Sequence, residues 1–168
     1  MNKKWDKSLN LRPFKESDLI FLKHLYATIR EPEVAQAQFT PQQKQLFFTQ
    51  QFEAQHSHYM KNYCTDDFNI IEVAGQPIGR LYLDHWRTET RIVDIALLPE
   101  FRANGIGGFL LKKVITEAHK NNKPVSIHVE KFNPARKLYE KLGFKFKSEF
   151  NEVYILLECK PQINHACD

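Results

Sequence analysis

Residues 97–108 read Leu-Leu-Pro-Glu-Phe-Arg-Ala-Asn-Gly-Ile-Gly-Gly, with glycine at positions 105, 107 and 108. The residues that lead into the proline, 92–98, are almost all apolar, which predicts a strand covered on both faces. From 105 to 121, apolar side chains recur at helical spacing, which predicts a long helix. The quoted stretch is therefore expected to turn a buried strand directly into the first turn of a helix.

Such a helix start attracts anions, because its N–H groups lack intrahelical partners and carry the positive end of the helix dipole. Glycines at 105, 107 and 108 let a phosphate approach the backbone, and Arg102 adds a charged donor. A turn that needs glycine only for its geometry has the same composition, so both interpretations stay open. A dinucleotide-binding fingerprint fits poorly, since position 110 is Leu where that pattern has a third glycine.

The hydrophobic pattern elsewhere predicts a mixed sheet flanked by helices, an α/β (α+β) fold. A hairpin is expected around residues 74–77, and Pro32 is expected to stop the first helix. The predicted strands are 9–12, 68–73, 78–84, 92–98, 124–129, 145–149 and 153–159. The predicted helices are 19–29, 41–59, 105–121 and one that starts at Asn133-Pro134 and stops at Gly143.

Length and composition suit one domain over residues 1–168, with 42% hydrophobic residues to build a core. The net charge is +4, but residues 112–147 carry a net +7 and residues 16–100 a net −5. One part thus suits a polyanion and the other a cationic acceptor, although solvated helix faces give similar counts. The basic part lacks interleaved aromatic residues, so no nucleic-acid partner is expected.

The sequence shows neither a secretory pattern nor an apolar run of membrane-spanning length, so we expect a soluble cytoplasmic protein without a membrane partner. Cys64, Cys159 and Cys167 lack metal-ligand spacing and are expected to be reduced thiols. His56 and His58 are two residues apart on one predicted helix, which argues against a metal pair. No metal is expected, and the pattern leaves monomer and homodimer equally open.

Two segments resemble motifs of the GNAT superfamily of N-acetyltransferases. Residues 97–107 are similar to its acetyl-CoA motif, Arg/Gln-x-x-Gly-x-Gly/Ala, and residues 128–144 are similar to its second motif. The chain departs from the first motif at Ala103 and Asn104, where glycine or a basic residue is frequent. The predicted order of elements also matches, so the resemblance covers about residues 8–158 and is most specific over 92–146, the expected acetyl-CoA site.

The resemblance implies a mostly antiparallel sheet of about seven strands with about four helices, and a central strand pair that splays apart. It implies an N-acetyltransferase that moves an acetyl group from acetyl-CoA to a primary amine by direct attack, through a tetrahedral intermediate. The acceptor, a small-molecule or a protein amine, is not identified, and residues 14–60 form the variable acceptor side. The alternative is a non-catalytic acyl-CoA-binding or sensing module, against which Tyr139 and Asn133 speak.

The resemblance also implies site residues. Tyr139 stands where the superfamily often has the general acid that protonates the leaving thiolate, although a core role fits its helical spacing too. A backbone N–H near Leu97 or Leu98 is the implied oxyanion donor, with Leu98 preferred. The implied acetyl-CoA contacts are Ala96, Leu97, Leu98, Arg102, Ala103, Asn104, Gly105, Ile106, Gly107, Gly108, Asn133, Ala135, Arg136 and Tyr139.

The candidates for the general base are four carboxylates and one histidine, and we compare them by the residues that surround each in the sequence. Asp94 is a charge inside an otherwise apolar strand, which is costly unless it is paired, hydrogen-bonded or at a cleft, so it is the candidate base. Its alternative is a structural carboxylate, either paired with an arginine such as Arg80 or Arg91 or hydrogen-bonded to backbone groups. The other candidates are Glu72, Asp84, His128 and Glu130.

Overall fold

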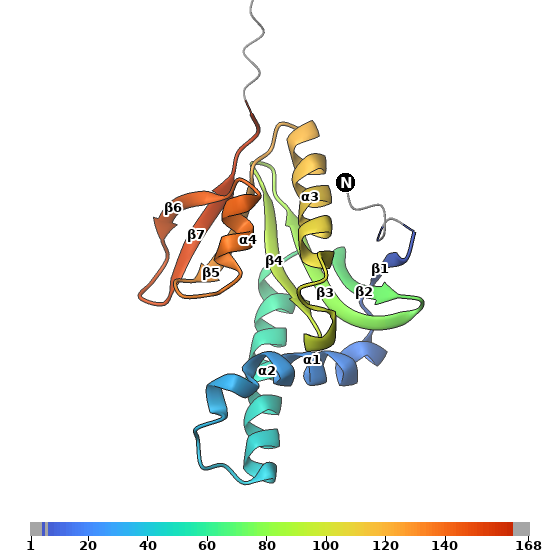
Figure 1. Ribbon diagram of the computed structural model, residues 1–168, viewed down its shortest axis with the longest axis vertical. Coiled ribbons are helices and arrows are strands. Elements are labelled where there is room, and N and C mark those ends of the chain that lie inside the picture. The colour runs from blue at the N-terminus through green and yellow to red at the C-terminus, as the bar shows by residue number, and fades with distance from the viewer. Residues whose placement is uncertain (1–4, 6, 163–168) are drawn as a thin grey trace, which may run out of the picture. The chain divides into compact units, whose positions relative to one another are not determined.

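A computed structural model describes Trp5 and residues 7–162 of the 168-residue chain. Over these residues it has seven strands, four α-helices and two 3-10 helices (Figure 1). In chain order they are β1 (Leu9–Pro13), η1 (Glu16–Asp18), α1 (Leu19–Val34), α2 (Pro41–Asn62), β2 (Asp67–Val73), β3 (Gln76–His85), β4 (Thr90–Leu97), η2 (Pro99–Phe101), α3 (Ile106–Lys120), β5 (Val125–Glu130), α4 (Arg136–Lys141), β6 (Lys145–Glu149) and β7 (Tyr154–Cys159). The strands form one sheet in the order β1-β2-β3-β4-β5-β7-β6, which confirms the predicted fold class.

The chain divides into two compact units, which we describe one at a time. The first comprises residues up to Tyr82 together with Asp94–Ile106, and the second comprises Leu83–Val93 and the chain from Gly107 onwards. The division runs through strands β3 and β4 and at the start of α3. The expectation of one domain over residues 1–168 stays a prediction.

In the first unit, β1 pairs with β2 in antiparallel fashion, with Leu11 opposite Ile71, and α1 packs across α2 (Figure 1). The predicted hairpin is present, since Ala74 and Gly75 have positive φ angles of 51° and 76°, as a two-residue turn between strands requires. One apolar cluster holds the helices to the strands. Its buried members are Leu22, Leu25, Tyr26, Phe52, Ile70, Ala96 and Leu98.

Of two predicted helix ends in this unit, the structure confirms one and contradicts the other. The Thr40-Pro41 start of α2 is confirmed, since Thr40 accepts a hydrogen bond from the Gln43 N–H at 3.2 Å and the Gln43 side chain bonds back. The expected stop at Pro32 is wrong, because α1 continues to Val34. Pro32 lacks the N–H for one backbone hydrogen bond, and only two helical residues follow it. The buried Val34 side chain holds the last turn in place.

In the second unit, β4 and β5 are parallel, with Arg91 opposite Ser126, while β7 pairs in antiparallel fashion with both β5 and β6. Figure 1 shows these last three strands beside α4. α3 buries the predicted stripe of Ile106, Leu110, Val114 and Ala118. No helix among the described residues is long and apolar enough to span a membrane.

Candidate active site

The turn between β4 and α3 requires glycine for its backbone conformation at one of its three glycine positions. Gly105 has a φ of 80°, so glycine is needed there for the backbone conformation. Arg102 donates from Nε to the Leu97 carbonyl at 2.9 Å, and the indole of Trp5 donates to the Asn104 carbonyl at 3.0 Å. Ala103 also lies in the left-handed region, with a φ of 57°. The turn is therefore held by one of its own side chains, Arg102, and by Trp5 from a distant part of the sequence.

Gly107 and Gly108, in the first turn of α3, are different. A Cβ atom added at these positions would come no closer than 3.9 Å and 3.5 Å to Leu138, which is ordinary van der Waals contact. Neither has a positive φ. Packing and backbone conformation therefore do not demand glycine here, and bare backbone N–H groups at a helix N-terminus are what a phosphate needs. Of the two interpretations of this turn, the ligand-binding one fits these two positions.

The end of β4 lies unusually close to β3. A Cβ atom on Gly79 would stand 2.2 Å from the Ala96 carbonyl oxygen, so only glycine fits at position 79. The Leu98 N–H donates to the Ile78 carbonyl at 2.8 Å. Leu98 was expected to supply a backbone donor to the ligand, and this bond corrects that expectation because its N–H already has a partner. Because amides alternate in direction along a regular strand, we expect the N–H of Leu97 to be the one directed away from β3.

The expected residues of the second motif lie on and just before α4. Asn133 accepts a hydrogen bond from the Ala135 N–H at 2.9 Å, and Arg136 donates to the Lys131 carbonyl at 2.5 Å. The helix itself begins at Arg136, so Asn133-Pro134 forms the preceding turn and not the first helical residues. Tyr139 is 5% exposed, which leaves both the core role and the acid role open.

Asp94, the candidate base, has two donors on one oxygen. Its Oδ2 accepts from Arg80 at 2.6 Å and from the Tyr59 hydroxyl at 2.8 Å. Arg80 also donates to the Gln55 side chain at 2.7 Å. Of the two arginines that the sequence offered as partners for Asp94, the structure selects Arg80. Tyr59 and Gln55 come from α2, and no sequence signal linked that helix to β4.

Arg80 is buried among aromatic rings. Its guanidinium lies 5.7 Å from the centre of the Tyr59 ring and 5.1 Å from that of Tyr82, and Tyr82 stacks on Phe68 at 4.1 Å. Burial, followed by the neighbouring Asp94 charge, raises the pKa of Tyr59, and burial raises the pKa of Tyr82 to about 12. Both phenols therefore stay protonated at neutral pH, so Tyr59 acts as a donor towards Asp94.

Two of the other candidate bases have strong partners of their own. Glu72 accepts from Arg12 at 2.5 Å and from Asn10 at 3.2 Å, and the Arg12 bond holds its pKa below the usual range. His128 lies 3.2 Å from an Arg91 nitrogen, and burial followed by the Arg91 charge lowers its pKa. These contacts give both residues a structural explanation.

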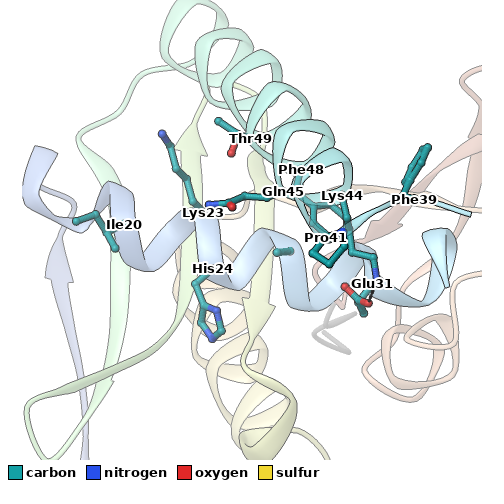
Figure 2. Close-up of a pocket in the computed structure, with 11 residues that line it drawn as sticks. Ile20, Lys23, His24, Glu31, Phe39, Pro41, Lys44, Gln45, Phe48 and Thr49 are labelled. Atoms are coloured by element: carbon teal, nitrogen blue, oxygen red, sulfur yellow. Dashed lines mark hydrogen bonds and ion pairs between the residues drawn. The ribbon is translucent and has the colours of Figure 1, made fainter. Parts of the chain in front are cut away.

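A groove of about 590 Å³ lies between α1 and α2 (Figure 2), within the segment expected to form the acceptor side. An ion pair of 2.7 Å between Lys44 and Glu31 lies on its rim. Its apolar lining includes Ile20, Phe39 and Phe48, and Lys23 and His24 line it as well (Figure 2). The groove is lined by Ile20, Lys23, His24, Ala27, Glu31, Phe39, Pro41, Lys44, Gln45, Phe48 and Thr49.

The thiols give no sign of catalytic activation. Burial raises the pKa of Cys159, which keeps that thiol protonated, and Cys64 is exposed. Cys167 lies outside the described residues. Over the part of the chain that the structure describes, no three His, Cys, Asp or Glu side chains gather into a group that could hold a metal ion.

Known proteins share both the sequence pattern and the fold. The Acetyltransferase (GNAT) family model matches residues 30–144, more than half of the chain, whereas no curated protein sequence matches. The PaiA N-acetyltransferase of Thermoplasma acidophilum, solved with coenzyme A, is similar at 18% identity and a TM-score of 0.66, over 91% of this chain and 99% of that one.

Two further solved structures share the fold. The ribosomal-protein-S18-alanine N-acetyltransferase of Escherichia coli has 17% identity and a TM-score of 0.59, over 95% of this chain and 99% of its own. A spermidine N-acetyltransferase chimera of Vibrio cholerae SpeG and hSSAT has 21% identity and a TM-score of 0.59, over 92% of this chain and 96% of its own. Such identities show the fold alone, whereas the family match covers most of the chain. The chain therefore belongs to the GNAT acetyltransferase family and is an acyltransferase that uses acetyl-CoA.

Proposed function

We propose that this enzyme transfers the acetyl group of acetyl-CoA to a primary amine by direct attack, without an acyl-enzyme. The observation that carries the proposal is the start of α3, where Gly107 and Gly108 are required neither by packing nor by backbone conformation. A pyrophosphate needs the free N–H groups of such a helix start. The proposed donor-binding residues are Ala96, Leu97, Arg102, Ala103, Asn104, Gly105, Ile106, Gly107, Gly108, Asn133, Ala135, Arg136 and Tyr139.

Each reacting group has a proposed partner in the chain. Acetyl-CoA supplies an activated thioester carbonyl. The Leu97 N–H, in place of Leu98, donates a hydrogen bond to the carbonyl oxygen as it gains negative charge. Tyr139 supplies a proton to the leaving thiolate, since a phenol is a weak acid suited to a basic leaving group. Asp94 accepts a proton from the attacking ammonium, directly or through a water molecule.

The acceptor is proposed only as a class. The similar structures include an enzyme named for a ribosomal-protein alanine and one named for spermidine, so the shared fold accommodates both protein amines and small amines. The acidic balance of residues 16–100 favours a cationic acceptor. A cytoplasmic location, a monomeric or homodimeric state and the lack of nucleic-acid and membrane partners belong to the same proposal.

The proposal is tested by incubating the full chain with acetyl-CoA and a panel of amines, and by following thiol release alongside acetylated product. We expect amine-dependent release, and we expect Tyr139→Phe to lower kcat by about 100-fold while CoA affinity changes little. Phe144→Tyr, at the ring that contacts Tyr139, is a packing control. Tight CoA binding without release from any amine would favour the binding-module alternative, and unchanged kcat in Tyr139→Phe would remove that residue from the mechanism.

A further inference from the structure

We propose that Tyr59 and Arg80 are positioning residues that hold Asp94 by one oxygen and leave its other oxygen for the acceptor amine. This inference rests on the proposed function, because it gives the candidate base its geometry. Both donors reach Oδ2 of Asp94, at 2.8 Å and 2.6 Å. Among the described residues, Oδ1 receives no hydrogen bond, and the Asp94 side chain is 16% exposed.

The arrangement is rigid at each link. Tyr59 lies edge-on to Tyr63, Phe68 and Tyr82, which fixes the direction of its hydroxyl. The Arg80 guanidinium lies against both of the rings of Tyr59 and Tyr82, which are themselves in contact. Gln55, one turn before Tyr59 on α2, accepts from the same Arg80 nitrogen that bonds to Asp94. A carboxylate held this way has one orientation, which is what a reacting group in an active site requires.

The free-energy cost of this cluster argues that it does more than join α2 to the sheet. Arg80 is 2% exposed, and its Nε and Nη1 have no hydrogen-bond partner among the described residues. Burying a charged group costs several kcal/mol unless all its donors are satisfied. Well-packed apolar side chains hold a helix to a sheet without that cost, as Phe52 and Ile70 do in this same unit. A functional role for the paired carboxylate explains why the arginine is there.

The pair also limits what Asp94 does. Its charge is balanced by Arg80, so it does not act as a bare negative charge that concentrates cations. Its remaining oxygen instead accepts a single, directed hydrogen bond from the incoming ammonium and takes its proton. Binding of the amine and its deprotonation are therefore expected to depend on Asp94 together, while binding of CoA is not.

A double-mutant cycle tests the inference on the full chain, with acetyl-CoA and the amine of highest kcat/KM from the panel above. We expect Asp94→Asn to lower kcat/KM for the amine by about 100-fold. Tyr59→Phe, which keeps the ring, is expected to lower it roughly tenfold by freeing the carboxylate. The double variant is expected to be no worse than Asp94→Asn alone, because Tyr59 acts only through Asp94. Tyr63→Phe, one turn further on, is the matched control and should leave kcat/KM unchanged.

The affinity for CoA separates positioning from a structural role. Removing the Tyr59 hydroxyl frees the carboxylate but does not touch the donor-binding residues, so Tyr59→Phe should lower kcat/KM for the amine while the Kd for CoA stays within about twofold of wild type. Additive losses in the cycle, or a loss of CoA affinity in Tyr59→Phe as large as its loss of kcat/KM, would overturn the inference. If the Arg80→Met variant folds, it tests the same point. If it does not fold, Tyr59→Phe still provides the test. A wild type that releases no thiol with any amine would instead refute the proposed function.

Discussion

The two buried arginines of the sheet, Arg80 on β3 and Arg91 on β4, differ in how completely their nitrogens are paired. Arg91 is 6% exposed and finds Ser126 at 2.8 Å, His128 at 3.2 Å and Glu89 at 3.5 Å, one partner for each of its three nitrogens. Arg80 is 2% exposed and pairs only one of its nitrogens.

Under the proposal above, the contrast separates a structural arginine, Arg91, from one that positions a reacting group, Arg80. Arg91 also lies 4.6 Å from the centre of the Trp86 ring, so it joins the loop after β3 to the start of β5, and each of its three nitrogens has a partner. A fully satisfied polar cluster rigidifies a fold, whereas an incompletely satisfied one usually has another reason to persist. We therefore expect changes at Arg91 to lower stability and changes around Arg80 to lower activity.

The largest expected effect on stability comes from Arg91→Met. This change removes the positive charge that pairs with the Glu89 carboxylate, which also accepts a hydrogen bond from the buried Ser126 hydroxyl. We therefore expect a loss of about 3–5 kcal/mol in the free energy of unfolding. At temperatures well below unfolding, kcat/KM of the folded variant should stay within about twofold of wild type. Urea unfolding and steady-state kinetics on the same preparation measure both quantities.

Arg87→Met is the matched control for that change, because Arg87 lies four residues before Arg91, in the loop that leads into β4, but is exposed. It should change stability by less than about 0.5 kcal/mol. A loss below about 1 kcal/mol in Arg91→Met, or a loss of activity greater than its loss of folded protein, would remove the distinction between the two arginines.

The sequence predicted the elements of this fold well, because each depends on local periodicity. The alternating hairpin of β2 and β3 and the buried stripe of α3 are read from neighbouring residues alone. Pro32 was misjudged for the same reason. A local rule marks proline as a helix stop, but the burial of Val34 is a tertiary contact that the local sequence does not contain.

The site was less predictable, because its details depend on register and on contacts between distant segments. The register of β3 and β4 decides whether the amide of Leu97 or that of Leu98 faces β3. A shift of one residue reverses the answer, because successive amides point in opposite directions. The choice of Arg80 over Arg91 as the partner of Asp94 depends on the pairing of β3 with β4. Tyr59 reaches Asp94 across 35 residues of sequence, and its helical position alone suggested nothing beyond packing.

A smaller effect, of opposite sign, is expected at Tyr82. Its side chain is completely buried, and its hydroxyl has no hydrogen-bond partner among the described residues. Tyr82→Phe removes this unsatisfied group and keeps the stacking on Phe68, so we expect a gain of about 1 kcal/mol in the free energy of unfolding. Tyr59→Phe, which loses a real bond to Asp94, should instead lose about 1 kcal/mol. Destabilisation by Tyr82→Phe would show that its hydroxyl is satisfied after all.

The smallest effect concerns pH, and it involves the histidine beside each arginine cluster. Burial lowers the pKa of His128 in the second unit and of His56 in the first, and Arg91 and Arg80 respectively add to that lowering. As pH falls below about 6.5, the unfolded chain takes up protons that these folded histidines resist, so stability declines. It is fully present above that pH and is lost progressively below it.

His128→Asn keeps an oxygen acceptor for Arg91 but cannot titrate. We expect it to reduce the loss of unfolding free energy between pH 7.5 and 5.5 by less than about 1 kcal/mol, because the histidine is only half-buried. His56→Asn should reduce the loss independently, since the two histidines share no partner. Urea unfolding at the two pH values measures both. An unchanged slope in His128→Asn would mean that the imidazole beside Arg91 is as easily protonated in the folded protein as in the unfolded chain.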